Sequence, residues 1–209
     1  MANKNHSLDK GIESSAMAEF AEKGYEKASL RKIAEAAGVT IGAIYTRYKT
    51  KDILFCAMVK PLLDKIEESF ESIKEDYFNE TQENYIAGIK KAMNDESETI
   101  LHLLFDDYQR AKLLLCKSGG SSLENFFDII IQRKIDETVK FFEVMDIKNI
   151  NRELIKLLIN SQFHMYFQII SEGYSLEKAK KIMSDASVYS TGGWLALFEK
   201  IKGINGGLK

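Results

Sequence analysis

The stretch "SLRKIAEAAGVTIGAIYTRYKTKDIL", residues 29–54, decides how the N-terminal part of the chain folds. Ser29 is a residue type that favours the N-cap of a helix, and Gly38 is a residue type that favours the position after a helix end. Between them, the apolar side chains recur at the spacing of one helical face, at Leu30, Ile33, Ala34 and Ala37. The stretch therefore predicts a short helix from Ser29 to Gly38.

A second helix follows after only about two residues. Thr40 is its predicted N-cap, and Tyr48 lies near its end. Val39 and Ile44 stand at the two positions of a hydrophobic staple, which fixes the angle at which a helix leaves a turn. Two helices joined by a tight turn that contains glycine are typical of the helix-turn-helix motif, whose second helix enters the major groove of DNA.

Further helices are predicted on both sides of this pair. Upstream, a helix is expected from about Ser7 or Leu8 to Glu22, with Gly24 as its stop. Its apolar residues are spaced four apart, at Leu8, Ile12, Ala16 and Phe20. Downstream, Thr50 is expected to cap a fourth helix that the only proline of the chain, Pro61, interrupts. We predict that residues 1–51 form one small domain of three helices.

The remainder, residues 52–209, is predicted to be a larger helical domain. The chain of 209 residues is 45% hydrophobic and 29% charged, and no alternating run of β-branched residues predicts a strand. The fold class is therefore expected to be all-α. Longer helices are predicted at 81–93, 96–104, 105–117, 121–146, 149–173 and 176–201. The fourth of these should begin at Ser121, which forms a capping box with Glu124 after paired glycines.

The charge is distributed unevenly along the chain. Residues 1–51 contain nine Lys or Arg and six Asp or Glu, a net charge of +3, whereas the whole chain carries −2. A basic head on an acidic body suits a protein that docks on a polyanion through one end. An excess of +3 also fits an ordinary solvated surface, so the charge alone does not decide between the two.

Neither targeting segments nor metal ligands stand out in the sequence. No apolar run approaches the roughly 20 residues of a membrane span, and the first residues lack the apolar segment of a signal peptide, so a cytoplasmic protein is expected. Cys56 and Cys116 lie far apart in apolar contexts and are expected to be reduced core thiols. His102 and His164 have no companion ligands at metal spacing, so no metal and no cofactor is expected.

The run "FAEKGYEKASLRKIAEAAGVTIGAIYTRYKTKDIL", residues 20–54, resembles the DNA-binding domain of the TetR family of bacterial transcriptional repressors. It matches the family's Phe-x-x-Lys-Gly-Tyr opening, its Ile-Ala-x-x-Ala-Gly-Val turn and its Gly-x-Ile-Tyr-x-x-Tyr-x-x-Lys segment. The resemblance implies an all-helical homodimer. Its N-terminal domain would bind DNA, and its larger C-terminal domain would bind a small-molecule effector and form the dimer.

The predicted DNA-binding residues come partly from their chemistry and partly from this resemblance. Hydroxyl and cationic side chains that can donate to DNA are Thr40, Tyr45, Thr46, Arg47 and Lys51. The resemblance implies phosphate contacts for Thr40, Tyr45 and Lys51, and places Ile41 and Gly42 at the base edges.

Three assignments of DNA-binding residues stay open at this point. Arg47 fits a DNA contact and a solvated charge equally well. Ser29 is in the first place the N-cap of a helix, and a phosphate contact would be a second role of the same residue. Tyr48, where the family more often has Phe, keeps an aromatic core contact and adds a hydroxyl.

Candidate effector-binding residues are the aromatic and apolar side chains of the second domain. A cavity between helices would be lined by such residues, although an ordinary core would contain them too. The six candidates are Met58, Leu62, Tyr108, Phe126, His164 and Phe167.

The dimer interface is predicted on the last two long helices, 149–173 and 176–201. Glycine inside a helix costs on the order of 1 kcal/mol relative to alanine, and a close approach of two helices would offset that cost. The candidate residues are Gly192, Gly193, Trp194 and Leu195. The alternative is that the glycines mark a local kink.

Together these observations predict a ligand-responsive transcriptional regulator, most simply a repressor. It would bind a palindromic operator as a homodimer and be released by a small-molecule effector. Activation in place of repression is a variant of the same hypothesis.

Two alternative functions belong to other classes of protein. One is an enzyme that encloses its substrate in a helical bundle, against which stands the absence of a nucleophile–base pair, a metal constellation or a phosphate-binding glycine loop. The other is a protein-interaction module that keeps the helix-turn-helix shape without binding DNA.

Overall fold

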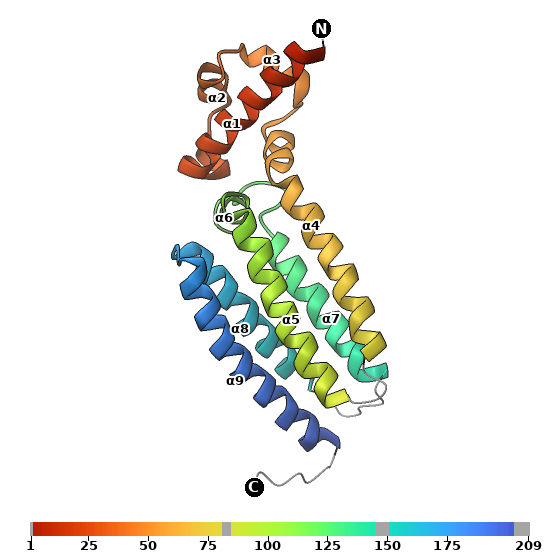
Figure 1. The fold of residues 1–209 in the computed structure, drawn as a ribbon. Helices are drawn as coiled ribbons and strands as arrows, with labels where there is room; N and C mark the ends of the chain where they lie inside the picture. The colour runs from red at the N-terminus through yellow and green to blue at the C-terminus, as the bar shows by residue number, and fades with distance from the viewer. Residues whose placement is uncertain (1, 81–84, 145–150, 203–209) are drawn as a thin grey trace. The chain divides into compact units, whose positions relative to one another are not determined.

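The computed structural model describes residues 2–80, 85–144 and 151–202, with side chains within 8–70, 95–143 and 151–201. These residues form nine helices, and no strand occurs among them, which confirms the predicted all-α fold (Figure 1). The helices are α1 (Ala2–Lys27), α2 (Leu30–Ala36), α3 (Ile41–Arg47), α4 (Lys51–Glu80), α5 (Tyr85–Asp106), α6 (Tyr108–Cys116), α7 (Phe126–Val144), α8 (Arg152–Ser171) and α9 (Leu176–Lys202).

The helices pack into two compact units. The N-terminal unit consists of Met1–Ile66 and Asp107–Phe127, and thus contains α1, α2, α3, the first part of α4, and α6. The C-terminal unit consists of Glu67–Asp106 and Asp128–Lys209, and contains the second part of α4 with α5, α7, α8 and α9. The predicted domain boundary after Lys51 stays a prediction.

The core of the N-terminal unit is built from one face of each short helix. Ile12, Ala16 and Phe20 of α1 are fully buried as their spacing predicted, whereas Leu8, at the start of the stripe, is 37% exposed. Helix α1 packs against α2, and α2 against α3. The ring of Phe20 meets the ring of Phe55 from α4 edge-on, with 5.1 Å between centroids. Aromatic packing therefore joins α1 to the first turns of α4.

Gly24 breaks the helical backbone of α1 where a stop was predicted, but α1 resumes and continues to Lys27. Its backbone, at φ 74° and ψ 166°, is not helical and lies in a region that essentially only glycine adopts. The break frees the N–H of Tyr25 from the helical ladder, and this N–H donates to the carbonyl oxygen of Lys117 at 2.8 Å. The glycine therefore joins α1 to the end of α6.

The predicted helix starts are confirmed at three positions, with one difference. The Thr40 hydroxyl oxygen accepts from the N–H of Ala43 at 3.2 Å, and that of Thr50 accepts from the N–H of Ile53 at 3.0 Å. Ser29 occupies the N-cap of α2 with an extended backbone, but its side chain makes no capping hydrogen bond. The N–H of Ser29 instead donates to the Glu19 carboxylate of α1 at 3.0 Å, which ties the start of α2 to α1.

Three predicted boundaries in the later helices were wrong. Helix α4 continues through Pro61 without interruption, and α5 is a single helix where a break near residue 95 was predicted. Helix α7 begins at Phe126 and not at Ser121, because the Ser121 hydroxyl donates to the carbonyl of Ser118 at 2.6 Å and holds a turn in place. The predicted helix limits at 81, 146 and 149 lie outside the described residues.

The C-terminal unit combines an apolar core with two polar pairs, each of which includes a buried residue of α5. Helices α5 and α9 lie side by side (Figure 1). The Lys134 ammonium of α7 lies 2.7 Å from the Glu96 carboxylate of α5, and the Tyr166 hydroxyl of α8 donates to Ser97 of α5 at 3.2 Å. Burial raises the pKa of the Tyr166 hydroxyl, so it stays neutral. These pairs connect α5 to α7 and α8, because buried polar groups require partners.

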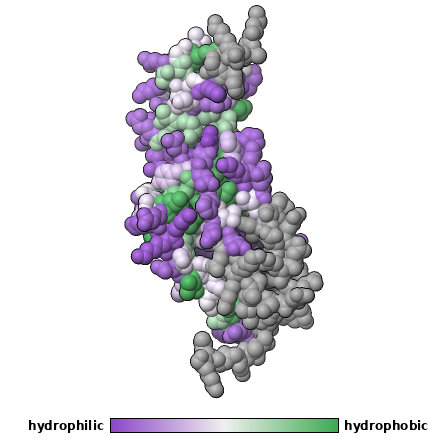
Figure 2. Space-filling view, viewed as in Figure 1, coloured by the Kyte–Doolittle hydropathy of each residue, from purple (hydrophilic) through white to green (hydrophobic). Residues whose placement is uncertain are grey.

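Some large apolar side chains of the described residues reach the surface. Figure 2 shows hydrophobic residues as small patches between hydrophilic ones. The most exposed are Val188 and Tyr189 of α9, at 76% and 85%, followed by Leu157 of α8 at 66% and Ile129 of α7 at 61%. Among the described residues, no helix has the length and hydropathy that a membrane span requires.

We predict that Gly24→Ala destabilises the N-terminal unit, because an L-residue is strained at this φ and ψ. The expected loss is about 1–3 kcal/mol in the free energy of unfolding, measured by denaturant or thermal unfolding. Gly119→Ala is the matched control, since Gly119 lacks a positive φ and an added Cβ would meet no atom within 4 Å. Equal stability of the two variants would contradict the strain assigned to Gly24.

Candidate nucleic-acid interface

Local hydrogen bonds close the turn between α2 and α3. Gly38, at φ 66°, lets the chain reverse after α2. The N–H of Gly38 then donates to the carbonyl of Glu35 at 3.1 Å, and that of Val39 to the carbonyl of Ala34 at 3.0 Å. Since these bonds satisfy the last carbonyls of α2, the turn is short and α3 leaves it at one defined angle.

Helix α3 has one buried face and one exposed face. Ile44 is fully buried, whereas Ile41 and Tyr45 are 38% and 46% exposed. Gly42 and Thr46 are also exposed, as is the cap residue Thr40. Most of the side chains predicted to contact DNA therefore lie on the solvent side of a helix that a single isoleucine anchors to the core.

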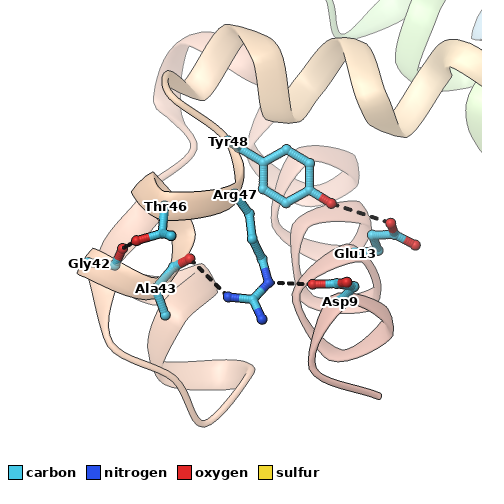
Figure 3. A network of polar contacts seen from close by, with 7 residues as sticks. All are labelled: Asp9, Glu13, Gly42, Ala43, Thr46, Arg47 and Tyr48. Carbon is cyan, nitrogen blue, oxygen red and sulfur yellow. Dashed lines mark hydrogen bonds and ion pairs between the residues drawn. The ribbon is translucent and has the colours of Figure 1, made fainter. Parts of the chain in front are cut away.

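Arg47 and Tyr48, at the end of α3, point back toward α1 (Figure 3). The Arg47 guanidinium forms an ion pair with the Asp9 carboxylate, and it also donates to the carbonyl of Ala43 at 3.3 Å. The Tyr48 hydroxyl donates to the Glu13 carboxylate at 3.3 Å. The α1–α3 brace, as we name these four residues, therefore holds the end of α3 on α1.

The brace changes the interpretation of Arg47. The sequence left a DNA contact and a solvated charge open, and the structure adds a third role, because the Arg47 side chain is only 23% exposed and paired with Asp9. Asp9 and Glu13 stand four residues apart on α1, so they share one face of that helix. This spacing is visible in the sequence, but the partner is 38 positions away, and no local pattern connects the two.

Burial, together with the neighbouring Glu13 carboxylate, raises the pKa of the Tyr48 hydroxyl. The hydroxyl therefore remains protonated and able to donate to Glu13.

Lys51 lies at the start of α4 but its ammonium group turns toward the end of α1. The nitrogen donates to the carbonyls of Glu26 at 3.1 Å and Ala28 at 3.4 Å, and it lies 4.5 Å from the centre of the Tyr25 ring. A cation next to the carbonyl end of a helix is favourable, because the helix dipole is negative there. In this structure Lys51 thus binds protein groups, and the predicted phosphate contact stays a prediction.

Three exposed cations near the motif were not among the residues that the sequence predicted to contact DNA. Arg31 and Lys32 lie on α2, and Lys49 lies in the turn between α3 and α4. Their signal in the sequence is only their charge, which does not distinguish a phosphate contact from a solvated surface.

The six effector-pocket candidates are divided between the two units. Met58 and Leu62 belong to the N-terminal unit and are 3% and 0% exposed. Tyr108 and Phe126 belong to the same unit. His164 and Phe167 belong to the C-terminal unit, where His164 is exposed and its Nδ1 lies 2.8 Å from the carbonyl of Asn160. That these residues line one cavity stays a prediction.

The four dimer candidates face different surroundings. Trp194 is 9% exposed and packs near the rings of Phe142 and Phe198, with centroid distances of 6.3 and 6.4 Å. It therefore contributes to the core of its own unit. Leu195 is half-buried, whereas Gly192 and Gly193 are exposed, and a Cβ added at either glycine would meet nothing within 4 Å.

Within the described part of the chain, no three His, Cys, Asp or Glu side chains gather at a distance suitable for a metal ion. The chemistry available near α3 is instead hydrogen bonding by hydroxyls and ion pairing by cations. This chemistry suits recognition of a phosphodiester backbone and base edges.

These elements are similar to a known protein family. The model of the family described as "Bacterial regulatory proteins, tetR family" matches residues 12–58, which include α2, the turn and α3. The HTH-type transcriptional repressor Rv1474c of Mycobacterium tuberculosis is 44% identical over 41 residues, which are 20% of this chain and 22% of that protein. The "Probable acrEF/envCD operon repressor" of Escherichia coli K12 is 34% identical over 95 residues, 43% of either chain.

These matches thus span less than half the length of either curated relative. The likeness extends further in three dimensions. The structure of the transcriptional regulator FadR from Bacillus subtilis in complex with stearoyl-CoA has a TM-score of 0.55 at 18% identity. The comparison covers 84% of this chain and 95% of that one, so the two share a fold.

We predict that the α1–α3 brace stabilises the N-terminal unit modestly. Arg47→Ala and Asp9→Asn should each lower the free energy of unfolding by about 0.5–1 kcal/mol, because the pair is partly exposed and screened by solvent. The double variant should lose little more than either single variant, and the coupling should shrink at high salt. Lys49→Ala is the control for loss of a nearby cation. Fully additive losses in the double variant would show that the two side chains do not interact in solution.

Proposed function

We propose that this chain is a member of the tetR family of bacterial regulatory proteins and a ligand-responsive transcriptional repressor that acts on DNA in the cytoplasm. The observation that carries the proposal is the structure of α3, whose single buried anchor Ile44 leaves the opposite face exposed and polar. Both curated relatives are named repressors, which favours repression over activation. We assign the chain no catalytic role.

In this proposal the N-terminal half of α3 enters the major groove. Ile41 and Gly42 would lie at base edges, where the absence of a side chain at Gly42 permits close approach. The hydroxyls of Thr40 and Tyr45 would donate to phosphates or bases. The Thr46 hydroxyl donates to the carbonyl of Gly42 at 2.9 Å (Figure 3), so it would have to exchange this acceptor for one on DNA. The Thr40 hydroxyl oxygen already accepts from the N–H of Ala43, so its hydroxyl proton remains to donate to a phosphate.

Arg47 and Tyr48 support the interface in a different way from the other candidates. We propose that they hold α3 in place through Asp9 and Glu13 and do not contact bases. Ser29 and Lys51 lie at the two ends of the motif, where phosphates of the flanking backbone would pass. Lys51 would contact a phosphate by exchanging one of its two carbonyl acceptors for the phosphate oxygen.

The partner in DNA binding would be a second copy of the chain. Two-fold symmetry of a dimer requires two half-sites in inverted orientation. The exposed apolar side chains Val188 and Tyr189 of α9 and Leu157 of α8 are the groups that such an interface would cover. The exposed Gly192, one turn after Val188, would permit close approach of the partner helix.

The effector would bind the C-terminal unit and shift α4. An effector acts only to the extent that it prefers one conformation over the other. FadR is described in complex with stearoyl-CoA, and the C-terminal unit has an apolar core with the polar pairs Lys134–Glu96 and Tyr166–Ser97. We therefore propose an effector with an apolar chain and a polar end group, and place acyl-CoA thioesters first in a screen.

We predict that Tyr45→Phe weakens binding to a specific DNA duplex about three- to tenfold, because it removes one hydroxyl donor and leaves the ring. Fluorescence anisotropy with a labelled duplex from upstream of the chain's own gene and with a scrambled duplex measures the effect. Tyr174→Phe removes a hydroxyl from the C-terminal unit and is the matched control.

The affinity for the specific duplex should also fall steeply as the salt concentration rises, since phosphate contacts release counterions. Binding that is insensitive to salt and to Tyr45→Phe would favour a protein-interaction module.

We predict that Val188→Asp disrupts the homodimer. A charge buried in the interface should raise the dissociation constant about 30-fold or more in sedimentation experiments. Ile129→Asp is the control, because Ile129 is also apolar and 61% exposed but lies on α7. A dimer that Ile129→Asp breaks and Val188→Asp leaves intact would place the interface on a different surface.

A further inference from the structure

Pro61 lies inside α4, yet the helix continues through it. A proline has no N–H, so the carbonyl of Ala57, four residues earlier, receives no helical hydrogen bond from it. The proline ring also crowds the preceding turn, which normally kinks or breaks a helix at a cost of about 3 kcal/mol. Something must therefore hold this turn of α4 in helical form.

A side chain from another helix reaches this turn. Arg110 of α6 donates from Nε to the carbonyl oxygen of Met58 at 2.6 Å. In a regular helix this carbonyl accepts from the N–H of Leu62, the residue directly after the proline. The guanidinium thus adds a charged donor at the turn where the proline weakens the ladder, and charge-assisted hydrogen bonds are the stronger kind.

The direction of approach fits this role. Met58 and Leu62 are 3% and 0% exposed, whereas Pro61 itself is exposed. The proline ring therefore points to solvent, and Arg110 contacts the buried side of the same turn. The arginine is therefore a donor that the fold supplies on this side of the turn.

Asp107 fixes the arginine in this position. Its carboxylate accepts from the second arm of the Arg110 guanidinium at 2.7 Å, and it is 18% exposed. Asp107 occupies the N-cap position of α6 with φ −135° and ψ 56°, but its side chain does not cap the helix. The carboxylate is used on Arg110 instead, and the same residue forms the bend between α5 and α6.

Other bonds already attach α6 and the loop after it to the rest of the N-terminal unit. The carbonyl of Lys117 accepts from Tyr25 at 2.8 Å, and the N–H of Ser122 donates to the Asp52 carboxylate of α4, also at 2.8 Å. The first contact attaches the end of α6 to α1, and the second holds the start of α4. The Arg110 contact lies more than a helical turn further along, at the proline.

We propose that Asp107 and Arg110 form a latch on the proline turn of α4, and that Arg110 is the positioning residue that couples α6 to α4. The latch keeps this turn of α4 helical within the N-terminal unit. Because α4 follows α3 after only a short turn, the latch also affects the placement of α3. This last step alone rests on the proposed DNA-binding function.

The first test is a double-mutant cycle that needs neither DNA nor effector. Hydrogen–deuterium exchange of peptides covering residues 57–66 is measured for wild type, Arg110→Gln, Pro61→Ala and the double variant. We expect Arg110→Gln to accelerate exchange in this segment about tenfold, as loss of a charge-assisted hydrogen bond predicts. In the Pro61→Ala background the same change should accelerate exchange less than about threefold, because alanine restores the helical ladder.

Two controls separate the latch from general loss of structure. Arg110→Lys keeps the charge but cannot serve both acceptors with a planar fork, so it should give an intermediate acceleration. Arg152→Gln removes an arginine whose ion pair with Glu143 is exposed on the C-terminal unit and should leave the segment unchanged. Equal acceleration by Arg110→Gln in both backgrounds, or none in either, would overturn the latch.

The second test uses a DNA duplex enriched for binding from a random library. We expect Arg110→Gln to change the affinity for this duplex at least about threefold and to lose most of that effect in the Pro61→Ala background. An arginine that only stabilises the fold would act alike in both backgrounds, and that result would overturn the coupling. If wild-type protein enriches no duplex, the proposed function and with it the coupling to α3 fail, whereas the exchange experiment still decides on the latch.

Discussion

The arrangement of the candidate interface depends on the burial of Ile44. Helix α3 has only seven residues, and a helix of this length is not stable by itself in water. Its conformation and direction are therefore set by its contacts: Ile44 in the core, Thr40 at the cap, and the α1–α3 brace at its far end. Because these contacts all lie on one side or at the ends, the other side is left free for a ligand.

Local signals in the sequence predicted this part of the fold well. Thr40, Thr50 and Gly38 are each read from neighbours within four residues, and the structure confirms all three. Distant partners were not accessible in the same way. The pairing of Arg47 with Asp9 depends on how α1 crosses α3, and Trp194 faces its own core because Phe142 from α7 lies beside it. Propensity also failed where tertiary contacts compete with it, as at Ser121, whose hydroxyl holds a turn in place of a helix start.

Pro61 shows the same competition in α4. Its residue type favours an interruption, and the structure keeps the helix because Arg110 and Asp107 provide a donor and its anchor from outside the segment. The two polar pairs of the C-terminal unit follow a similar logic. Glu96 and Ser97 are adjacent on α5 and buried, and each has its partner on a different helix, Lys134 or Tyr166. In both units, polar side chains thus fix the relative placement of helices whose apolar contacts alone are not directional.

The central claim is that two copies of α3 recognise inverted half-sites of one DNA duplex. Selection of duplexes from a random library by the wild-type protein at physiological salt tests this claim directly, because it requires no knowledge of the natural site. The account predicts enrichment of an inverted repeat, and loss of that enrichment when Ile44 is replaced by aspartate. Enrichment of no sequence, or of one without two-fold symmetry, would contradict it.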